Sequence, residues 1–565
     1  MRGFEKLLKT TIDTLEHLSV AAHNQPPQPN YNYNYQQQHP PSQNTTGLYE
    51  GAAYSRVVYP NPTDGKLVYP PYNEFGDHLF DFSAAGYNEG WTPLPAVGPV
   101  TASLDPVPGS QDDSGRIQQA INELAATPSQ SLKTLQLNRG NFVLARPVEI
   151  SSSGIVLQGD PAGGTIITVM TDPLDTPYVF KISGEPNVMS KKRVPIVDDY
   201  IPVGHNQVTV RDKNRFKVGD TVMVGVAFND AWIKAVGMDV IIPKGDTSKN
   251  IGWKAGRFEH HRRIVRIDES GTRLTLNEPI TAALSSKHGG GFVEKYESKR
   301  VQNVGLQFLE CVFPANEKRG PEEMMKSQKF KVKDYRFADE MFNHLLILMD
   351  HAENCWVRNV RSVWFRNFVR VGTNALAITF QHCYHTFPMP PSPDPKKPLL
   401  AGQFAFEISG QMILIEHCHA EYSFHAYSYK GRVPGPNVVY SSSCVAKNGD
   451  VGPHMKWSTG QLYDNCNVDG QIIIQDRYDA GSGHGWSGAN SVVWNSVAHS
   501  GMIVQKPPLS QNFLIGSSSK RAKPRVQGHE WAWEESPDRK VNPPSLYMAQ
   551  LAERRQRLSS MQNIV

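Results

Sequence analysis

The sequence predicts an all-β protein, a parallel β-helix with a small antiparallel β insertion and a short C-terminal helix. Three observations predict it. The chain has 565 residues, too many for one ordinary compact domain but suited to a repeat structure that grows in one dimension. Gly (45) and Pro (41) are frequent, as in a turn-rich β protein. Strand-like segments that carry a cysteine recur at intervals of 44, 28, 35, 26 and 22 residues, a period typical of a solenoid.

The repeat is marked by six cysteines in or beside these segments: Cys311, Cys355, Cys383, Cys418, Cys444 and Cys466. A seventh segment, SVVWNSVAHS, has Ser496 in the corresponding place. Successive coils of a β-helix stack about 4.8 Å apart, so equivalent positions form rows in which small side chains fit at the corners. We therefore expect a buried row of free thiols. The alternative is three disulfides.

Composition and charge exclude several classes of protein. Lys and Arg exceed Asp and Glu by 58 − 54 = 4, too small an excess to indicate a nucleic-acid binder. No segment reaches the roughly 18 apolar residues that span a membrane. The N-terminus as given lacks the apolar run of a secretory signal. Leu-rich heptads are absent and 39% of the residues are hydrophobic, which excludes a coiled coil and a wholly disordered chain.

Four parts follow one another along the chain. Residues 1–46 predict a short amphipathic helix and then a low-complexity linker that is too polar to fold. Residues 47–105, rich in Tyr, Pro and Gly, are expected to wrap the main domain. The β-helix is expected over residues 106–516. Residues 517–565 predict a polar tail and a terminal helix, which would cover the exposed edge of the last coil.

The β-helix has a recognisable beginning and one interruption. The motif DDSGRIQQAI at residues 112–121 predicts a capped helix with one apolar face. Short β segments, separated by Gly and Asn turns, follow it up to residue 159. Residues of about 190–300 break the rhythm, because a turn at residues 268–271 joins two strands as a hairpin. This pattern predicts the antiparallel β insertion.

Two stretches of sequence resemble a known family. DDSGRIQQAI, followed by strands that end in Gly, resembles the opening of the pectate-lyase superfamily, the pectin-lyase-like β-helices. GPHMKWSTGQLYDN, QDR, GSGHGWSGAN and VWN, between Gly452 and Asn495, look like a poorly characterised carbohydrate-active branch of it. The resemblance covers about residues 106–515. It implies a right-handed, single-stranded β-helix, a polysaccharide substrate and an extracellular location, and leaves the oligomeric state open. Because the superfamily includes lyases, hydrolases, epimerases and binding proteins, function must be argued from the site.

Polar residues are dense between residues 417 and 490, where strands in register would bring distant side chains onto one face. Cleavage of a uronic-acid polysaccharide by β-elimination needs a base for the C5 proton, a cation for the carboxylate and a proton for the leaving oxygen. The candidate acids and bases are His425, His454 and His484. Arg477 would clamp the carboxylate with its bidentate fork. The expected substrate-binding residues are Lys456, Trp457, Asp464, Asp476, Trp486 and Asn490.

Other interpretations of the same residues stay open. The histidines and tryptophans could be structural. A glycoside hydrolase on this fold would need two carboxylates about 5–10 Å apart, for which Asp464 and Asp476 are the nearest candidates, with Glu421 behind them. A non-catalytic glycan-binding or structural β-helix is the third alternative.

No cofactor is expected, although carboxylates such as Asp464 and Asp476 could hold Ca²⁺. The sequence EHHRR at residues 259–263 resembles a metal-ligand cluster. However, His260 and His261 would point to opposite faces of a strand and could not chelate one ion. No Cys-x-x-Cys is present to suggest zinc.

Overall fold

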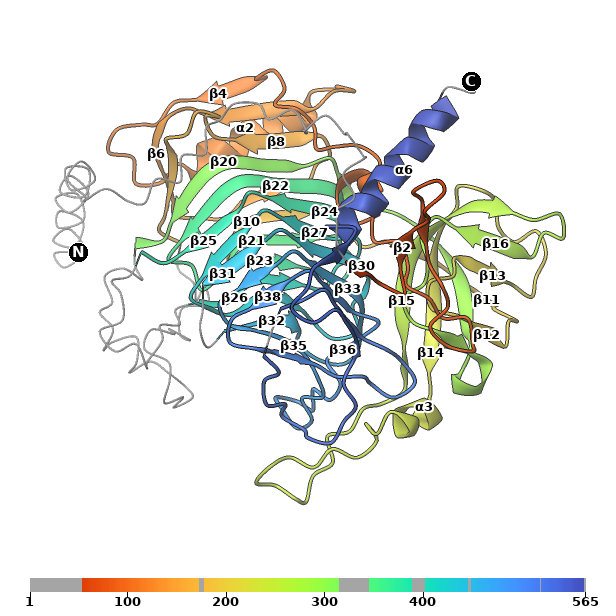
Figure 1. The fold of residues 1–565 in the computed structure, drawn as a ribbon. Helices are drawn as coiled ribbons and strands as arrows, with labels where there is room; N and C mark the ends of the chain where they lie inside the picture. The colour runs from red at the N-terminus through yellow and green to blue at the C-terminus, as the bar shows by residue number, and fades with distance from the viewer. Residues whose placement is uncertain are drawn as a thin grey trace. The chain divides into compact units, whose positions relative to one another are not determined.

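Successive coils of the chain stack their strands in parallel, and these stacks make up most of the fold (Figure 1). The computed structural model describes residues 53–171, 177–314, 345–388, 402–445, 449–518 and 520–562. The helix and linker predicted for residues 1–46 lie outside this part of the chain.

One face of the β-helix is a nine-stranded parallel sheet. Its order follows the sequence from β7 to β39, as expected for a coil that advances by one strand per turn. The strands are β7 (Val148–Ile150), β10 (Tyr178–Ser183), β21 (Leu345–Asp350), β23 (Asn367–Val371), β26 (Gly402–Ile408), β29 (Ser423–Tyr429), β32 (Asp450–Pro453), β35 (Gln471–Ile474) and β39 (Met502–Val504).

A 21-stranded sheet supplies the other two faces. Strand β22 belongs to both, since its first part pairs with β24 and its last part with β25. The strands of one face are β4 (Ala102–Leu104), β5 (Lys133–Leu137), β8 (Ile155–Gln158), β19 (Val301–Gln302), β20 (Gly305–Val312), β22 (Ala352–Val363), β24 (Leu376–Gln381), β27 (Leu414–Glu416), β30 (Pro434–Tyr440), β33 (Ser458–Asp464), β36 (Gly488–Ala489), β37 (Val492–Trp494), β40 (Phe513–Ile515) and β41 (Trp533–Glu535). The other face adds β6 (Gly140–Leu144), β9 (Thr165–Val169), β25 (Tyr384–Thr386), β28 (His419–Glu421), β31 (Ser443–Val445), β34 (Asn467–Val468) and β38 (Val497–Ala498). The predicted fold class is confirmed.

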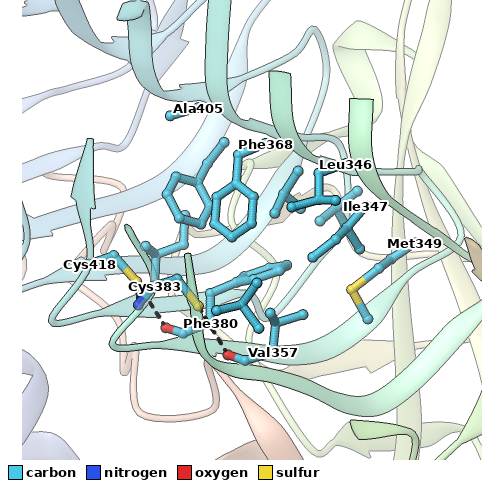
Figure 2. Close-up of a cluster of buried hydrophobic side chains, with 14 of the residues drawn as sticks. Leu346, Ile347, Met349, Val357, Phe368, Phe380, Cys383, Ala405 and Cys418 are labelled. Atoms are coloured by element: carbon cyan, nitrogen blue, oxygen red, sulfur yellow. Dashed lines mark hydrogen bonds between the residues drawn. The ribbon is translucent and has the colours of Figure 1, made fainter. Parts of the chain in front are cut away.

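Rows of side chains stacked in register fill the interior. Ile347, Val369, Phe406 and Tyr427 follow one another across four neighbouring strands, and each is fully buried. Figure 2 shows part of this core, with Cys383 and Cys418 beside Phe380. Burying one such side chain stabilises the fold by roughly 1.5–3 kcal/mol, so this continuous apolar interior is the main source of stability.

A corner of the coil is made by backbone in the left-handed region. After β24, β27 and β30 the chain turns through His382, His417 and Ser441, whose φ angles are 52°, 52° and 46°. Asn465 and Asn495 hold the same place in later coils. Asn tolerates positive φ better than most residues because its short side chain can bond locally. This need explains why Asn recurs after the strands of this face.

The next position of the corner carries the small residues that the sequence suggested. It is occupied in successive coils by Cys383, Cys418, Ser442, Cys466, Ser496 and Ser517. The backbone N–H of one corner residue donates to the side chain of the next coil's corner residue. Cys383 donates to Cys418 Sγ (3.4 Å), Cys418 to Ser442 Oγ (3.1 Å) and Cys466 to Ser496 Oγ (2.9 Å). The small side chains therefore connect neighbouring coils.

All six cysteines are free and buried, but the expectation of one shared row is wrong. Cys311 and Cys444 lie in a second row, which passes through Ser362, His385 and Ala420. Cys355 pairs with Ile378 in a third position. The recurrence of cysteine in strand-like segments concealed this difference, because a shift of a few residues moves a side chain to another part of the coil.

The predicted antiparallel insertion is a six-stranded sheet in the order β11-β18-β14-β15-β16-β13. Its strands are β11 (Val188–Pro195), β13 (Gln207–Thr209), β14 (Thr221–Phe228), β15 (Gly256–Ile267), β16 (Arg273–Leu276) and β18 (Gly291–Glu297). Short elements accompany it: β12 (Tyr200–Ile201), β17 (Leu284–Ser285), η2 (Ser286–His288) and α3 (Asp230–Ala235). The buried guanidinium of Arg262 on β15 donates to the carbonyl oxygen of Gly435 (2.9 Å), which joins the insertion to the β-helix.

The two flanking segments meet each other. Strand β1 (Ala53–Tyr54) pairs with β42 (Val541–Asn542). The remaining elements are β2 (Tyr59–Pro60), β3 (Leu67–Val68), η1 (Tyr87–Gly90), α2 (Ser114–Ala126) and the C-terminal helix α6 (Leu546–Gln562). In the part of the chain that the structure describes, no helix is both long enough and apolar enough to cross a membrane.

Candidate active site

The four residues predicted to be catalytic are brought together beside the last strands of the nine-stranded sheet. His425 is on β29, His454 directly follows β32, and Arg477 and His484 belong to the loop after β35. The ring centroids of His425 and His454 are 4.5 Å apart, and those of His454 and His484 are 4.9 Å apart. We call His425, Asp450, His454, Arg477 and His484 the histidine cluster.

His425 has a fixed hydrogen-bonding partner. Its Nδ1 lies 2.6 Å from Oδ1 of Asp450, the residue that faces it in register on β32. Because a carboxylate only accepts, Nδ1 carries the proton, and Nε2 of the neutral ring carries the lone pair. No described residue forms a hydrogen bond with Nε2. Such a carboxylate-oriented imidazole has the arrangement of a general base.

His454 has the opposite tautomer. Arg477 Nη1 donates to Nδ1 of His454 (2.9 Å) and to its carbonyl oxygen (3.0 Å). A guanidinium has no acceptor, so Nδ1 must be unprotonated and the neutral ring carries its proton on Nε2. Burial, followed by the charges of His425 and Arg477, lowers the pKa of His454 well below its usual value. His454 is therefore a neutral donor at physiological pH.

His484 is 9% exposed, and its buried Nδ1 has no hydrogen-bonding partner among the described residues. Burial, then the charges of Arg477 and Lys456, lowers its pKa to about 4. The left-handed turn at Gly481 (φ 53°) permits this placement, because a Cβ there would lie 2.2 Å from Cε1 of His484. The glycine run GSGHG thus fits the imidazole into the cluster.

Positive charge dominates the surroundings of the histidine cluster. Lys456 and Arg432 follow β32 and β29, and no carboxylate among the described residues pairs with either. Burial, then Arg432, lowers the pKa of Lys456, and burial lowers that of Arg432. Lys430 differs, since its ammonium is 2.5 Å from Glu407. An anionic ligand would relieve this excess of positive charge.

The two tryptophans predicted to bind substrate are not at the surface. Trp457 and Trp486 are 4% and 1% exposed and belong to the insertion's hydrophobic core. Trp457 meets Trp232 edge to face, with ring centroids 4.8 Å apart, and Trp486 Nε1 donates to the carbonyl of Val236. Both indoles join the insertion to the β-helix, and their burial overturns the expectation that they bind substrate. Lys456 is the one predicted substrate-binding residue whose charged end stays near the cluster.

Three other predicted substrate-binding residues, Asp464, Asp476 and Asn490, have structural partners instead. Asp464 is fully buried and accepts hydrogen bonds from Ser545 Oγ (2.7 Å) and the N–H of Tyr547 (2.8 Å), at the start of α6. Asp476 accepts from its own loop at the N–H of Tyr478 and faces His529.

Asn490 Nδ2 donates to the carbonyl oxygen of Thr281 on the insertion (2.9 Å). Asp464 and Asp476 thus have separate structural partners. Among the described residues, no group of three His, Cys, Asp or Glu side chains could hold a metal ion.

Asp450 and Lys430 are parts of the site that the sequence analysis missed. Asp450 stands between a Gly and a Val with no motif around it, and only its register with His425 reveals its role. Phe404 was missed for the same reason, although its ring stacks on His425 at 4.9 Å and lies under the Lys430 ammonium at 4.7 Å. The sequence does not show which residues of adjacent coils are neighbours unless the length of each coil is known.

No protein-family model matches this chain, and no curated protein matches it. Solved structures of low similarity do. The tailspike protein gp49 of Pseudomonas phage LKA1 aligns with 12% identity and a TM-score of 0.38, over 72% of this chain and 57% of that one. The tailspike of E. coli bacteriophage HK620 aligns with 11% identity and a TM-score of 0.35, over 83% and 66%.

Polygalacturonase from Erwinia carotovora aligns with 11% identity and a TM-score of 0.31, over 80% of this chain and 96% of the enzyme. The aligned part of this chain spans less than two thirds of the length of each of the two tailspikes. At such low similarity none of these proteins carries an argument about activity. The fold rests on the strand pairing described above, and the function rests on the site.

Proposed function

We propose that this protein binds an acidic polysaccharide at the histidine cluster and cleaves it by β-elimination. The observation that supports the proposal is the oriented His425–Asp450 pair beside cations that lack carboxylate partners among the described residues. Nε2 of His425 takes the C5 proton of a uronate, the electron pair forms the C4–C5 double bond, and the C4–O bond breaks. The departing glycosidic oxygen takes up a proton.

The residues around His425 neutralise the substrate carboxylate and protonate the departing oxygen. Lys456 and Arg432 neutralise the uronate carboxylate and so stabilise the charge that develops when C5 loses its proton. His454 and His484 are neutral rings, and Nε2–H of His454 is a donor for the departing oxygen. Arg477 holds His454 in this tautomer and is a positioning residue. A cluster of positive charge suits an anionic substrate better than a neutral one.

The test is an assay against pectin, alginate, glucuronan and glycosaminoglycans that follows both ultraviolet absorbance and new reducing ends. β-Elimination produces both signals. Breaking the C4–O bond leaves an unsaturated uronate, which absorbs ultraviolet light, on one fragment and a new reducing end on the other. His425→Ala should remove both, and His499→Ala, a change at a histidine outside the cluster, should leave both unchanged. New reducing ends without absorbance would show hydrolysis and contradict the proposal, as would full activity of His425→Ala.

One observation favours a second function, glycan binding without cleavage. His425 is only 3% exposed, and the ring of Phe424 lies 4.2 Å from its own, so a sugar must displace covering side chains to reach Nε2. If the protein only binds, affinity electrophoresis will show retardation by an acidic glycan and no product will form. His425→Ala would then keep its affinity, whereas Lys456→Ala would weaken it.

A further inference from the structure

A cavity of about 650 Å³ lies outside the histidine cluster. Strands β11, β14, β15 and β18 of the insertion line it, together with His351 and Asn374 from the turns after β21 and β23 of the β-helix. Its volume falls within the roughly 300–1,000 Å³ of pockets that bind small molecules. None of the residues assigned to polysaccharide cleavage lines this cavity. Any ligand in it would therefore occupy a second site.

His261 contributes a donor of fixed direction to this cavity. His260 and His261 point to opposite faces of β15, as expected from strand alternation. His260 contacts Thr281, and His261 lines the cavity. Arg300 Nη2 donates to Nδ1 of His261 (3.3 Å), so the neutral ring carries its proton on Nε2. Burial, then the charges of Arg300 and Arg262, lowers the pKa of His261 and keeps the ring neutral.

Two further lining residues have donors without acceptors. Nδ2 of Asn187 and Nε of Arg257 are buried, and neither has a hydrogen-bonding partner among the described residues. Buried donors are normally satisfied, and an exception calls for an explanation such as an absent ligand. With Nε2–H of His261, three donors of the cavity wall lack acceptors among the described residues: two on β15, from Arg257 and His261, and one on Asn187, which directly precedes β11.

The carboxylates of the cavity are already paired. Glu294 accepts from Nε of Arg193 (3.0 Å) and from the backbone N–H of Lys191 (2.9 Å). Glu259 is 2.5 Å from Arg257. The lining holds three cationic side chains and two carboxylates, which leaves the ammonium of Lys191 without a carboxylate partner among the described residues. Such a lining selects a ligand that has acceptor oxygens and negative charge.

Met189 and Met223 give the cavity an apolar part, which suits the C–H face of a sugar ring. We propose that this cavity binds a monosaccharide that carries a carboxylate, a hexuronate, at a site separate from the histidine cluster. Its carboxylate faces Lys191 and Arg257, and its ring hydroxyls accept hydrogen bonds from Asn187 and Nε2–H of His261. This site goes beyond the cleavage proposed above and does not depend on it.

Titration calorimetry of the full chain with glucuronate and galacturonate, and with glucose and galactose as neutral counterparts, tests this site. A uronate should bind at least about tenfold more tightly than its neutral counterpart, because only the uronate pairs with the free ammonium. Lys191→Ala should lower uronate affinity about tenfold. Lys192→Ala is the matched control, since Lys192 is also exposed but does not line the cavity, and its affinity should not change.

His425→Ala separates this site from the histidine cluster. If the cavity is the site, His425→Ala binds the uronate with unchanged affinity, even if it no longer cleaves polysaccharide. Loss of uronate binding in His425→Ala would place the sugar in the histidine cluster and overturn the proposal. Equal affinity for uronates and neutral sugars, no binding of either uronate, or an unchanged affinity of Lys191→Ala would overturn it as well.

Discussion

Nδ1 of His425 lies 2.6 Å from Oδ1 of Asp450, although the two residues are 25 positions apart in the sequence. Adjacent coils of the β-helix bring them together, one from β29 and one from β32. Asp450 therefore sets the tautomer of His425 from the next coil. The proposed cleavage depends on that contact. Substitution of Asp450 therefore tests the proposal directly.

We expect Asp450→Asn to lower kcat for cleavage by about 10²–10⁴-fold, the usual contribution of general acid–base catalysis. An amide can donate to Nδ1 and so favours the tautomer with its proton on Nε2, which removes the base. The assay is the rate of ultraviolet absorbance on an accepted polysaccharide. Asp469→Asn makes the same chemical change outside the cluster and should keep full activity. An Asp450→Asn variant with normal kcat would show that this aspartate does not orient the proposed base.

Acid should destabilise the protein partly through His484. Its pKa falls from 6.5 to about 4 on folding, so the unfolded chain binds a proton more readily. The stability that the neutral ring contributes is present above pH 6.5 and is lost as the pH falls through 4. At pH 5, between these two pKa values, part of this stability is already lost. Melting temperatures at pH 7.5 and pH 5 should therefore differ less for His484→Gln than for the unchanged protein.

The control for this experiment is His499→Gln, which removes a histidine outside the cluster. Its melting temperature should show the same pH dependence as that of the unchanged protein. If His484→Gln also shows that dependence, proton uptake at His484 does not contribute to acid destabilisation.

Asp464→Asn should affect stability and not catalysis. The carboxylate accepts hydrogen bonds from Ser545 and Tyr547 at the start of α6, and an amide can keep only part of them. A buried donor left without its acceptor costs about 1–3 kcal/mol, so the melting temperature should fall. kcat/KM of the folded variant should match that of the unchanged protein. A large loss of activity with normal stability would show that Asp464 takes part in catalysis or substrate binding, as the sequence suggested.

The cysteines should resist modification in the native protein. All six thiols are buried and free, and burial raises the pKa of Cys355 and of Cys444 to about 12. Thiolate, the reactive form, is therefore scarce. An aromatic disulfide reagent should label none of them in buffer and all six in denaturant. Rapid labelling of the native protein would contradict their burial, and fewer than six in denaturant would indicate a disulfide.

The fold could be predicted because its causes repeat along the sequence. Small residues and Asn recur where each coil turns, and the hairpin at residues 268–271 marks the insertion. The grouping of His425, His454, Arg477 and His484 followed from the idea of aligned coils. The burial of Trp457, Trp486 and Asp464 could not be foreseen in this way, because the insertion and α6 cover them from distant parts of the chain. Pairwise neighbours such as Asp450 depend on the register between coils.

The bonds between corner residues join positions 35, 24, 30 and 21 apart along the chain. Coil length therefore varies freely, while the corner stays aligned. Each turn can lengthen or shorten at its remaining loops without disturbing the turns above and below. Changes of coil length can thus be accommodated in the outer loops, where a binding surface could be rebuilt for another ligand while the scaffold remained the same.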